Sequence, residues 1–67
     1  MNVKEAISLI KEDPKKRVKA SKWEKGHYLF IGGGSLNIIG LSRPNREEEP
    51  WPGASIQDIL DTWEIVE

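Results

Sequence analysis

Residues 17–31 read RVKASKWEKGHYLFI, and this stretch decides the predicted fold. In its first part Val18 and Ala20 alternate with basic residues, which is typical of a strand with one solvated face. The letters EKG then have the composition of a turn, and the aromatic and β-branched run HYLFI is typical of a second strand. The stretch therefore predicts two neighbouring antiparallel strands.

A third strand is predicted downstream. Residues 32–34 are three glycines, which supply the backbone freedom of a tight reversal, and the run LNIIGL at 36–41 returns as the next strand. Residues 42–52 contain three prolines and the acidic run Glu47 to Glu49, so they predict a polar surface loop that ends at Trp51. The middle of the chain is thus predicted to be a small antiparallel β-meander.

Upstream of the strands, residues 2–12 predict an amphipathic helix. Asn2 is a suitable N-cap, and Glu5 lies where it completes a capping box. Proline disfavours helical backbone in the residue before it, so Pro14 ends the helix. The apolar residues recur at the spacing of one helical face: Val3, Ala6, Ile7 and Ile10.

A second, short helix is predicted after Ser55, with Asp58 completing another capping box. Apolar residues follow at positions i, i+3, i+4 and i+7 and predict one buried face: Ile56, Ile59, Leu60 and Trp63. Residues 63–67 are predicted to form a final strand, because Ile and Val pack well on a pleated surface. The fold class is therefore α+β, with an N-terminal amphipathic helix, a small antiparallel meander, a short second helix and a C-terminal strand.

Length and composition predict one folded domain over residues 1–67. The chain has 67 residues, 37% of them hydrophobic and 31% charged, which is ordinary for a globular domain and too apolar for a disordered one. Such a small core supplies no more than about 3 to 5 kcal/mol of net stability. Zero cysteines exclude disulfides, so we expect a homo-oligomer to provide the missing stabilisation.

Charge is unevenly distributed along the chain. Residues 1–33 hold eight Lys or Arg and four acids, whereas residues 34–67 hold two and seven. Duplex-binding proteins usually show a clustered basic patch, and here only half of that signal is present, so we expect no nucleic acid partner. No apolar run approaches a membrane span or signal peptide, which predicts a cytosolic protein with no membrane partner.

No catalytic or metal site is predicted. The chain has no cysteine and only His27, so nucleophilic triads and histidine-rich metal sites lack parts. The acids at 47–49 are typical of a solvated loop, and Asp58 has a capping role available. The triple glycine is not followed by the Gly-Lys-Ser/Thr of a phosphate-binding loop, which favours a turn. We therefore expect no enzyme activity and no cofactor.

The tryptophans are the strongest functional signal. Trp51 lies between two prolines in a polar loop, and Trp23 lies at a strand end beside basic residues. Two such aromatics at element edges are typical of a site for a flat base and its phosphates. The alternative is that both cap the ends of a small core. Trp63 continues an apolar face and is predicted to be buried.

Taken together, the motifs resemble one family, the phage anti-defence proteins of the second Thoeris type. These are small sponge proteins that sequester cyclic nucleotide immune signals. The resemblance covers both ends of the chain and lies in five segments: NVKEA at 2–6, KRVKA at 16–20 running into Trp23, GHYL at 26–29, WPGASIQDIL at 51–60 and WEIVE at 63–67.

The resemblance implies a homodimer or homotetramer with pockets at subunit contacts. It implies that the protein binds a cyclic nucleotide signal, of the cyclic ADP-ribose type or a cyclic oligonucleotide, in the host cytoplasm without degrading it. Trp23 and Trp51 would then sandwich or edge the base, and Asp58 would accept hydrogen bonds from the ligand. Further predicted ligand-binding residues are Ser55, Arg17 and Tyr28. The alternatives are an accessory module that binds nucleic acid or protein, and a structural subunit.

Overall fold

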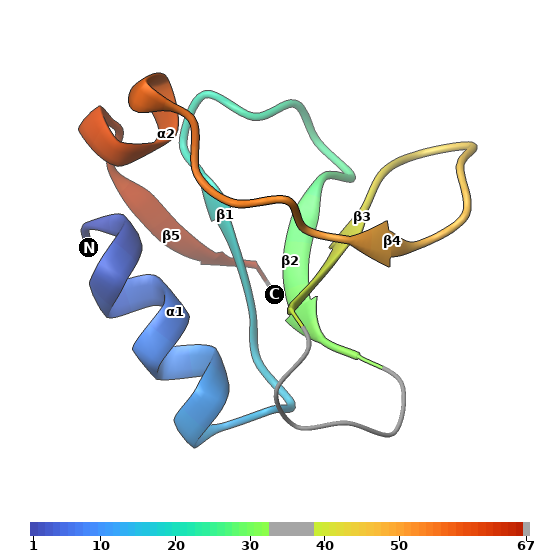
Figure 1. Ribbon diagram of the computed structural model, residues 1–67, viewed down its shortest axis with the longest axis horizontal. Coiled ribbons are helices and arrows are strands. Elements are labelled where there is room, and N and C mark those ends of the chain that lie inside the picture. The colour runs from blue at the N-terminus through green and yellow to red at the C-terminus, as the bar shows by residue number, and fades with distance from the viewer. Residues whose placement is uncertain (33–38, 67) are drawn as a thin grey trace.

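The computed structural model describes residues 1–32 and 39–66 and shows an α+β fold (Figure 1). Two helices, α1 and α2, accompany one antiparallel sheet with strand order β4-β3-β2-β1-β5. The bounds are α1 Val3–Glu12, β1 Arg17–Ala20, β2 Tyr28–Ile31, β3 Ile39–Ser42, β4 Glu49–Pro50, α2 Ile56–Leu60 and β5 Trp63–Val66. The predicted fold class is confirmed, including the strand at the C-terminus.

The predicted loop at 42–52 is corrected in one respect, because it contains β4. Pro50 pairs with Gly40 of β3, and the Trp51 amide donates to the Ile39 carbonyl over 2.8 Å. Proline is tolerated at a sheet edge, where its missing N–H faces away from the ladder. Most of the predicted reversal at 32–34 and the first half of the predicted strand 36–41 lie outside the described residues.

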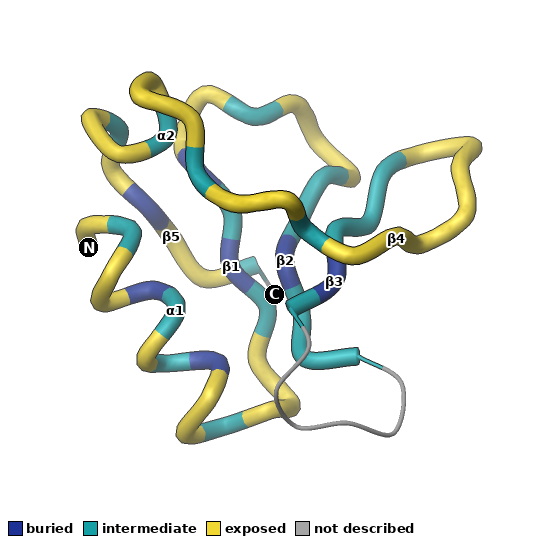
Figure 2. The backbone as a smooth tube through the Cα atoms, in the orientation of Figure 1, coloured by how far each residue is buried: buried dark blue, intermediate teal, exposed yellow. Residues whose placement is uncertain are grey.

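One face of the sheet carries the hydrophobic core. Directly paired residues of neighbouring strands point to the same face, and the pairs Val18–Leu29 and Ala20–Trp63 lie on the core face. Helix α1 covers it, as Figure 1 and the burial colours of Figure 2 show. The core consists of Ala6, Ile10, Val18, Ala20, Leu29 and Trp63, all at most 2% exposed. The alternation predicted for the first strand is therefore confirmed.

The other side of the sheet, which we call the open face, is covered by neither helix of the described chain. Side chains alternate along each strand, so the neighbours of the core residues point to this side. They are partly exposed for the most part. Register and alternation assign to the open face Arg17, Lys19, Tyr28, Phe30, Gly40, Ser42, Glu64 and Val66.

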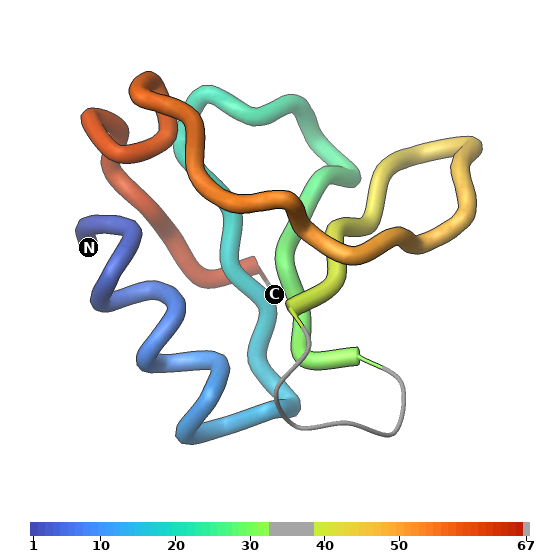
Figure 3. Tube along the Cα trace, in the orientation of Figure 1, coloured from blue at the N-terminus to red at the C-terminus, as the bar shows by residue number. Residues whose placement is uncertain are grey.

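Helix α1 begins and ends as predicted. Asn2 Oδ1 accepts from the Glu5 backbone N–H over 2.8 Å, and the Asn2 backbone N–H donates to Glu5 Oε1 over 3.0 Å. The helix ends with Asp13 as its C-cap, directly before Pro14. The N-terminal end of the tube in Figure 3 lies beside β5, and Met1 exchanges backbone hydrogen bonds with Trp63 of that strand. The N-terminal residue is thereby attached to the sheet edge.

Helix α2 forms with the predicted capping box, but the predicted buried face is wrong. Its three apolar side chains point into solvent, with Ile56, Ile59 and Leu60 exposed by 77%, 54% and 81%. The helix ends at Leu60, so Trp63 belongs to β5 instead of continuing a helical face. Asp58 is half-buried and is turned inward instead, toward Trp23. Neither described helix combines the length and apolarity that crossing a membrane requires.

Candidate functional site

Three tryptophans meet at one end of the core face, and we call them the tryptophan cluster: Trp23, Trp51 and Trp63. Trp63 is buried at its centre. Trp23 packs edge-on against it with ring centroids 5.0 Å apart, and Trp51 does so at 6.2 Å. Trp23 comes from the turn after β1 and Trp51 from the segment after β4. Residues far apart in the sequence thus share one aromatic surface, of which Trp23 and Trp51 are partly exposed.

Asp58 connects α2 to this cluster. The Trp23 indole N–H donates to Asp58 Oδ1 over 3.1 Å, and the Trp63 indole N–H donates to the Asp58 backbone carbonyl over 2.9 Å. The other carboxylate oxygen, Oδ2, accepts from the Ser55 amide over 3.1 Å, and Ser55 Oγ accepts from the Asp58 amide. Four predicted site residues are therefore brought together: Trp23, Trp51, Asp58 and Ser55.

The cluster offers a planar ligand two kinds of contact. A carboxylate has about four acceptor positions, and Asp58 uses one on each oxygen within the chain. The remaining positions suit a base N–H or a ribose hydroxyl, while the indole rings suit a base. Both Trp23 and Trp51 also pack against the core, as the core-capping alternative predicts. Their buried parts stabilise the fold, and their exposed parts are the surface available to a ligand.

Arg17 and Tyr28 do not join this cluster. Each is next in sequence to a core residue, Val18 or Leu29, so the pleat directs them to the open face. There the Arg17 guanidinium carbon lies 4.9 Å from the centre of the Tyr28 ring. A hydrogen bond with Ser42, and to a smaller extent one with Arg17, lowers the pKa of the Tyr28 phenol below its ordinary value. Within one chain, the six predicted residues thus form two separate groups.

Two residues of the open face were missed by the sequence analysis, Phe30 and Lys19. Phe30 meets Tyr28 edge-on with ring centroids 6.0 Å apart. Lys19 Nζ donates to the Trp23 carbonyl over 3.1 Å and lies 3.6 Å from Glu64. The signal was present in the alternation of residues 17–31, which places both on the same side as Arg17 and Tyr28. It was used only to identify strands.

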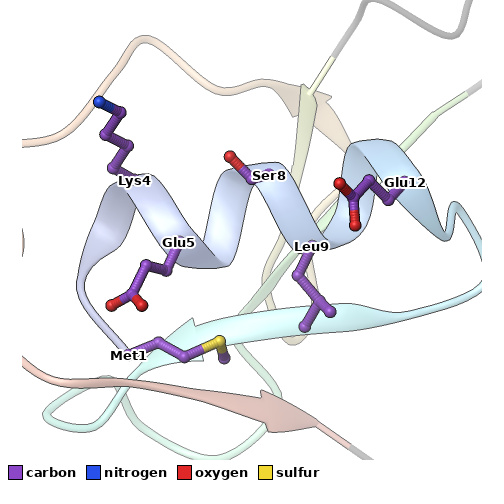
Figure 4. A pocket seen from close by; sticks show the side chains of 6 residues that line it. All are labelled: Met1, Lys4, Glu5, Ser8, Leu9 and Glu12. Carbon is purple, nitrogen blue, oxygen red and sulfur yellow. The ribbon is translucent and has the colours of Figure 1, made fainter.

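A pocket of about 360 Å³ lies along α1, away from both groups. Met1 and Leu9 provide its apolar wall, and Figure 4 shows the polar side chains around them. None of the predicted site residues lines it: the lining residues are Met1, Lys4, Glu5, Ser8, Leu9 and Glu12. Over residues 1–32 and 39–66, no three histidine or acidic side chains gather in a way that could hold a metal ion.

Comparison with known proteins returns no matching protein-family model, no matching curated protein and no matching solved structure. The resemblance to the anti-defence family stays a prediction that is carried by the quoted motifs alone.

Proposed function

We propose that this protein is a phage anti-defence sponge. As a homo-oligomer in the host cytoplasm, it binds a cyclic nucleotide signal, of the cyclic ADP-ribose type or a cyclic oligonucleotide, and withholds it without degrading it. The observation that carries the proposal is the packing of two partly exposed indoles, Trp23 and Trp51, against Trp63, with the carboxylate of half-buried Asp58 hydrogen-bonded to Trp23.

The aromatic surface supports binding of a base. Each base stacked on an aromatic side chain contributes about 1 to 3 kcal/mol. Asp58 is held in place by the Trp23 indole and by the Ser55 amide, so it is already oriented before a ligand arrives. Orientation in advance lowers the entropic cost of binding. The group therefore has the features of a site for a planar ligand with N–H or O–H donors.

The outward apolar side of α2 supports the homo-oligomer. Ile56, Ile59 and Leu60 are largely exposed in their own chain. A second copy is the occupant we propose, because the chain brings matching charges: its second half is acidic and its first half basic. Two copies related by a twofold axis can place each acidic α2 region against the basic region of the other. Burial of α2 would add to a core that is marginal on its own.

The affinity required of a sponge also favours a site completed by a second copy. Competing with a receptor calls for nanomolar binding, about −12 kcal/mol. At about 0.3 kcal/mol per non-hydrogen atom, this needs about 40 engaged atoms. Two partly exposed indoles and one carboxylate form only one wall of such a site. The outward side of α2 lies across this five-residue helix from Asp58, so a second copy that docks there can supply further contacts at the edge of the cluster.

Calorimetry with a panel of cyclic nucleotides and ADP-ribose derivatives tests the proposal. We expect one class to bind stoichiometrically and to be recovered intact after the protein is denatured by heat. Asp58→Asn should weaken binding by about 1.5 to 3 kcal/mol, because a charge-assisted hydrogen bond is lost. Asp61→Asn is the matched control, since the Asp61 carboxylate accepts from the Lys22 and Thr62 amides and does not contact the cluster.

Three results would contradict the proposal. A chemically altered ligand would indicate an enzyme, and equal affinities for the Asp58→Asn and Asp61→Asn variants would return Asp58 to a purely capping role. Failure of the whole panel to bind would leave the tryptophan cluster as a structural core cap.

A further inference from the structure

The open face of the sheet carries a row of aromatic rings that the proposed sponge site does not use. Phe30 lies across β3, where a Cβ added to Gly40 would overlap its ring. At Gly32 an added Cβ would lie 2.8 Å from Phe30 Cε2. Glycine at both positions therefore lets the ring lie against the backbone. Tyr28 continues the row, edge-on to Phe30 at an interplanar angle of 63°.

Cationic side chains border this row on β1. The Arg17 guanidinium lies over the Tyr28 ring at 4.9 Å, whereas the Lys19 ammonium is engaged by the Trp23 carbonyl and by Glu64. The negative charge of Glu48 acts in the other direction and raises the pKa of Tyr28. The charge of this face is therefore mixed, and Arg17 is the cation that lies directly on the aromatic row.

We infer that the open face binds a short single-stranded oligonucleotide, with a base stacked on Phe30 and a phosphate at Arg17. Aromatic rings on an exposed sheet face stack bases of any sequence, because every base has a π-face. Strands lie about 4.8 Å apart, so β1 to β3 span about 10 Å, which suits the two or three bases that sheet-face readers stack. Arginine donates through a planar fork that matches a phosphate.

The mixed charge limits the size of the ligand. A long polyanion or a duplex needs many cationic contacts, and the net charge of this chain is −1. Arg17 on the open face suits one or two phosphates, and stacking on Phe30 supplies the rest of the binding energy. The inference does not rest on the proposed sponge function, because the tryptophan cluster lies on the other side of the sheet.

Titration of the trinucleotide pTpTpT into isotopically labelled protein, followed by NMR, tests the inference. We expect shifts confined to the amides of β1, β2 and β3 and to the Phe30 ring protons. The indole N–H signals of Trp23 and Trp63 should stay in place. With one or two phosphates neutralised, the affinity should fall only about 3- to 7-fold from about 50 to about 200 mM salt.

Two variants sharpen the test. Phe30→Leu should weaken pTpTpT binding by about 5- to 150-fold through loss of the stacked base. Arg17→Gln should lower the slope of log affinity against log salt by about 0.7, because one phosphate contact is lost. Lys11→Gln is the control, since this exposed cation lies in the last turn of α1 on the covered side. It should leave affinity and slope unchanged.

Several results would overturn the inference. One is the absence of any NMR shift at millimolar pTpTpT. Another is a shift of the indole N–H signals while the amide signals of the open face stay in place. An unchanged salt slope for Arg17→Gln would also overturn the inference. This result would count even if Phe30→Leu fails to fold, and the amide spectrum of that variant shows whether it folds. A cyclic nucleotide that binds and displaces pTpTpT would contradict separate sites. Binding of pTpTpT alone, with no cyclic nucleotide bound, would support this inference and reject the sponge.

Discussion

Helices α1 and α2 begin with the same kind of cap, but α1 buries its apolar side and α2 exposes it. Each begins with a complete capping box, from Asn2 to Glu5 in α1 and from Ser55 to Asp58 in α2. Helix α1 then buries Ala6 and Ile10 in the core, whereas α2 buries none of its residues. A capping box and apolar spacing therefore accompany a helix in both places. They do not determine which side of the helix faces the protein.

The difference comes from the partners of the capping acid. In α1, Glu5 is exposed and accepts from the Asn2 backbone amide at the start of its own helix, so the apolar face is free to turn toward the sheet. In α2, Asp58 also accepts the Trp23 indole N–H and presents its carbonyl to Trp63. These bonds turn the polar side of α2 inward. Rotating the helix to bury Ile59 would break both.

The largest expected effect distinguishes the two apolar faces. Ile10→Ala should lower the free energy of unfolding by about 2 to 5 kcal/mol, because it leaves a cavity in the core. In the dissociated chain, Ile56→Ala should change it by no more than about 0.5 kcal/mol, because this side chain is 77% exposed. Urea unfolding at low protein concentration measures both. Similar losses in the two variants would contradict the inverted orientation of α2.

A second prediction concerns what covers the outward side of α2. Leu60→Ser should weaken self-association by about 1.5 to 3 kcal/mol per buried side chain while leaving the chain folded, because a leucine loses its apolar contact with the second copy. Sedimentation equilibrium at micromolar concentration measures the change, and Gln57→Ser on the same helix is the control. A wild-type protein that stays monomeric under these conditions would reject the proposed subunit contact.

The smallest expected effect compares the two caps. Asn2→Ala and Ser55→Ala should each cost about 1 kcal/mol of stability, since each removes a side-chain acceptor from a helix N-terminus. Only Ser55→Ala should also weaken nucleotide binding, because Ser55 Oγ accepts from the Asp58 backbone amide and thereby helps to position Asp58. Thermal unfolding and calorimetry on the same samples separate the two effects. Equal nucleotide affinities in both variants would show that Asp58 does not need its cap to bind ligand.

Much of the fold was predictable because it depends on local rules. Alternation identified the first strand, composition identified the second, and Pro14 marked the end of α1. Strand β4 was missed because Pro50 argues against a strand wherever its place in the sheet is unknown. The inward turn of α2 was missed because it depends on Trp23, which lies 35 residues away from Asp58.

The candidate site was predictable only in part, for the same reason. Residue type singled out Trp23 and Trp51, the family resemblance added Asp58, and the structure brings the three together. Nothing in the residue types of Arg17 and Tyr28 separates them from that group. Their separation follows from the two-residue period of a strand, in which a shift by one position moves a side chain to the opposite face.

The pairing of Met1 with Trp63 has a consequence for the order of events during synthesis. Trp63 also pairs with Ala20 in the ladder between β1 and β5, so β5 joins partners that are made much earlier, Met1 and β1. The core cannot close around Trp63 until β5 has been made. Until β5 has left the ribosome, the core side chains of the earlier elements stay exposed, and we expect the nascent chain to need protection from aggregation during that time.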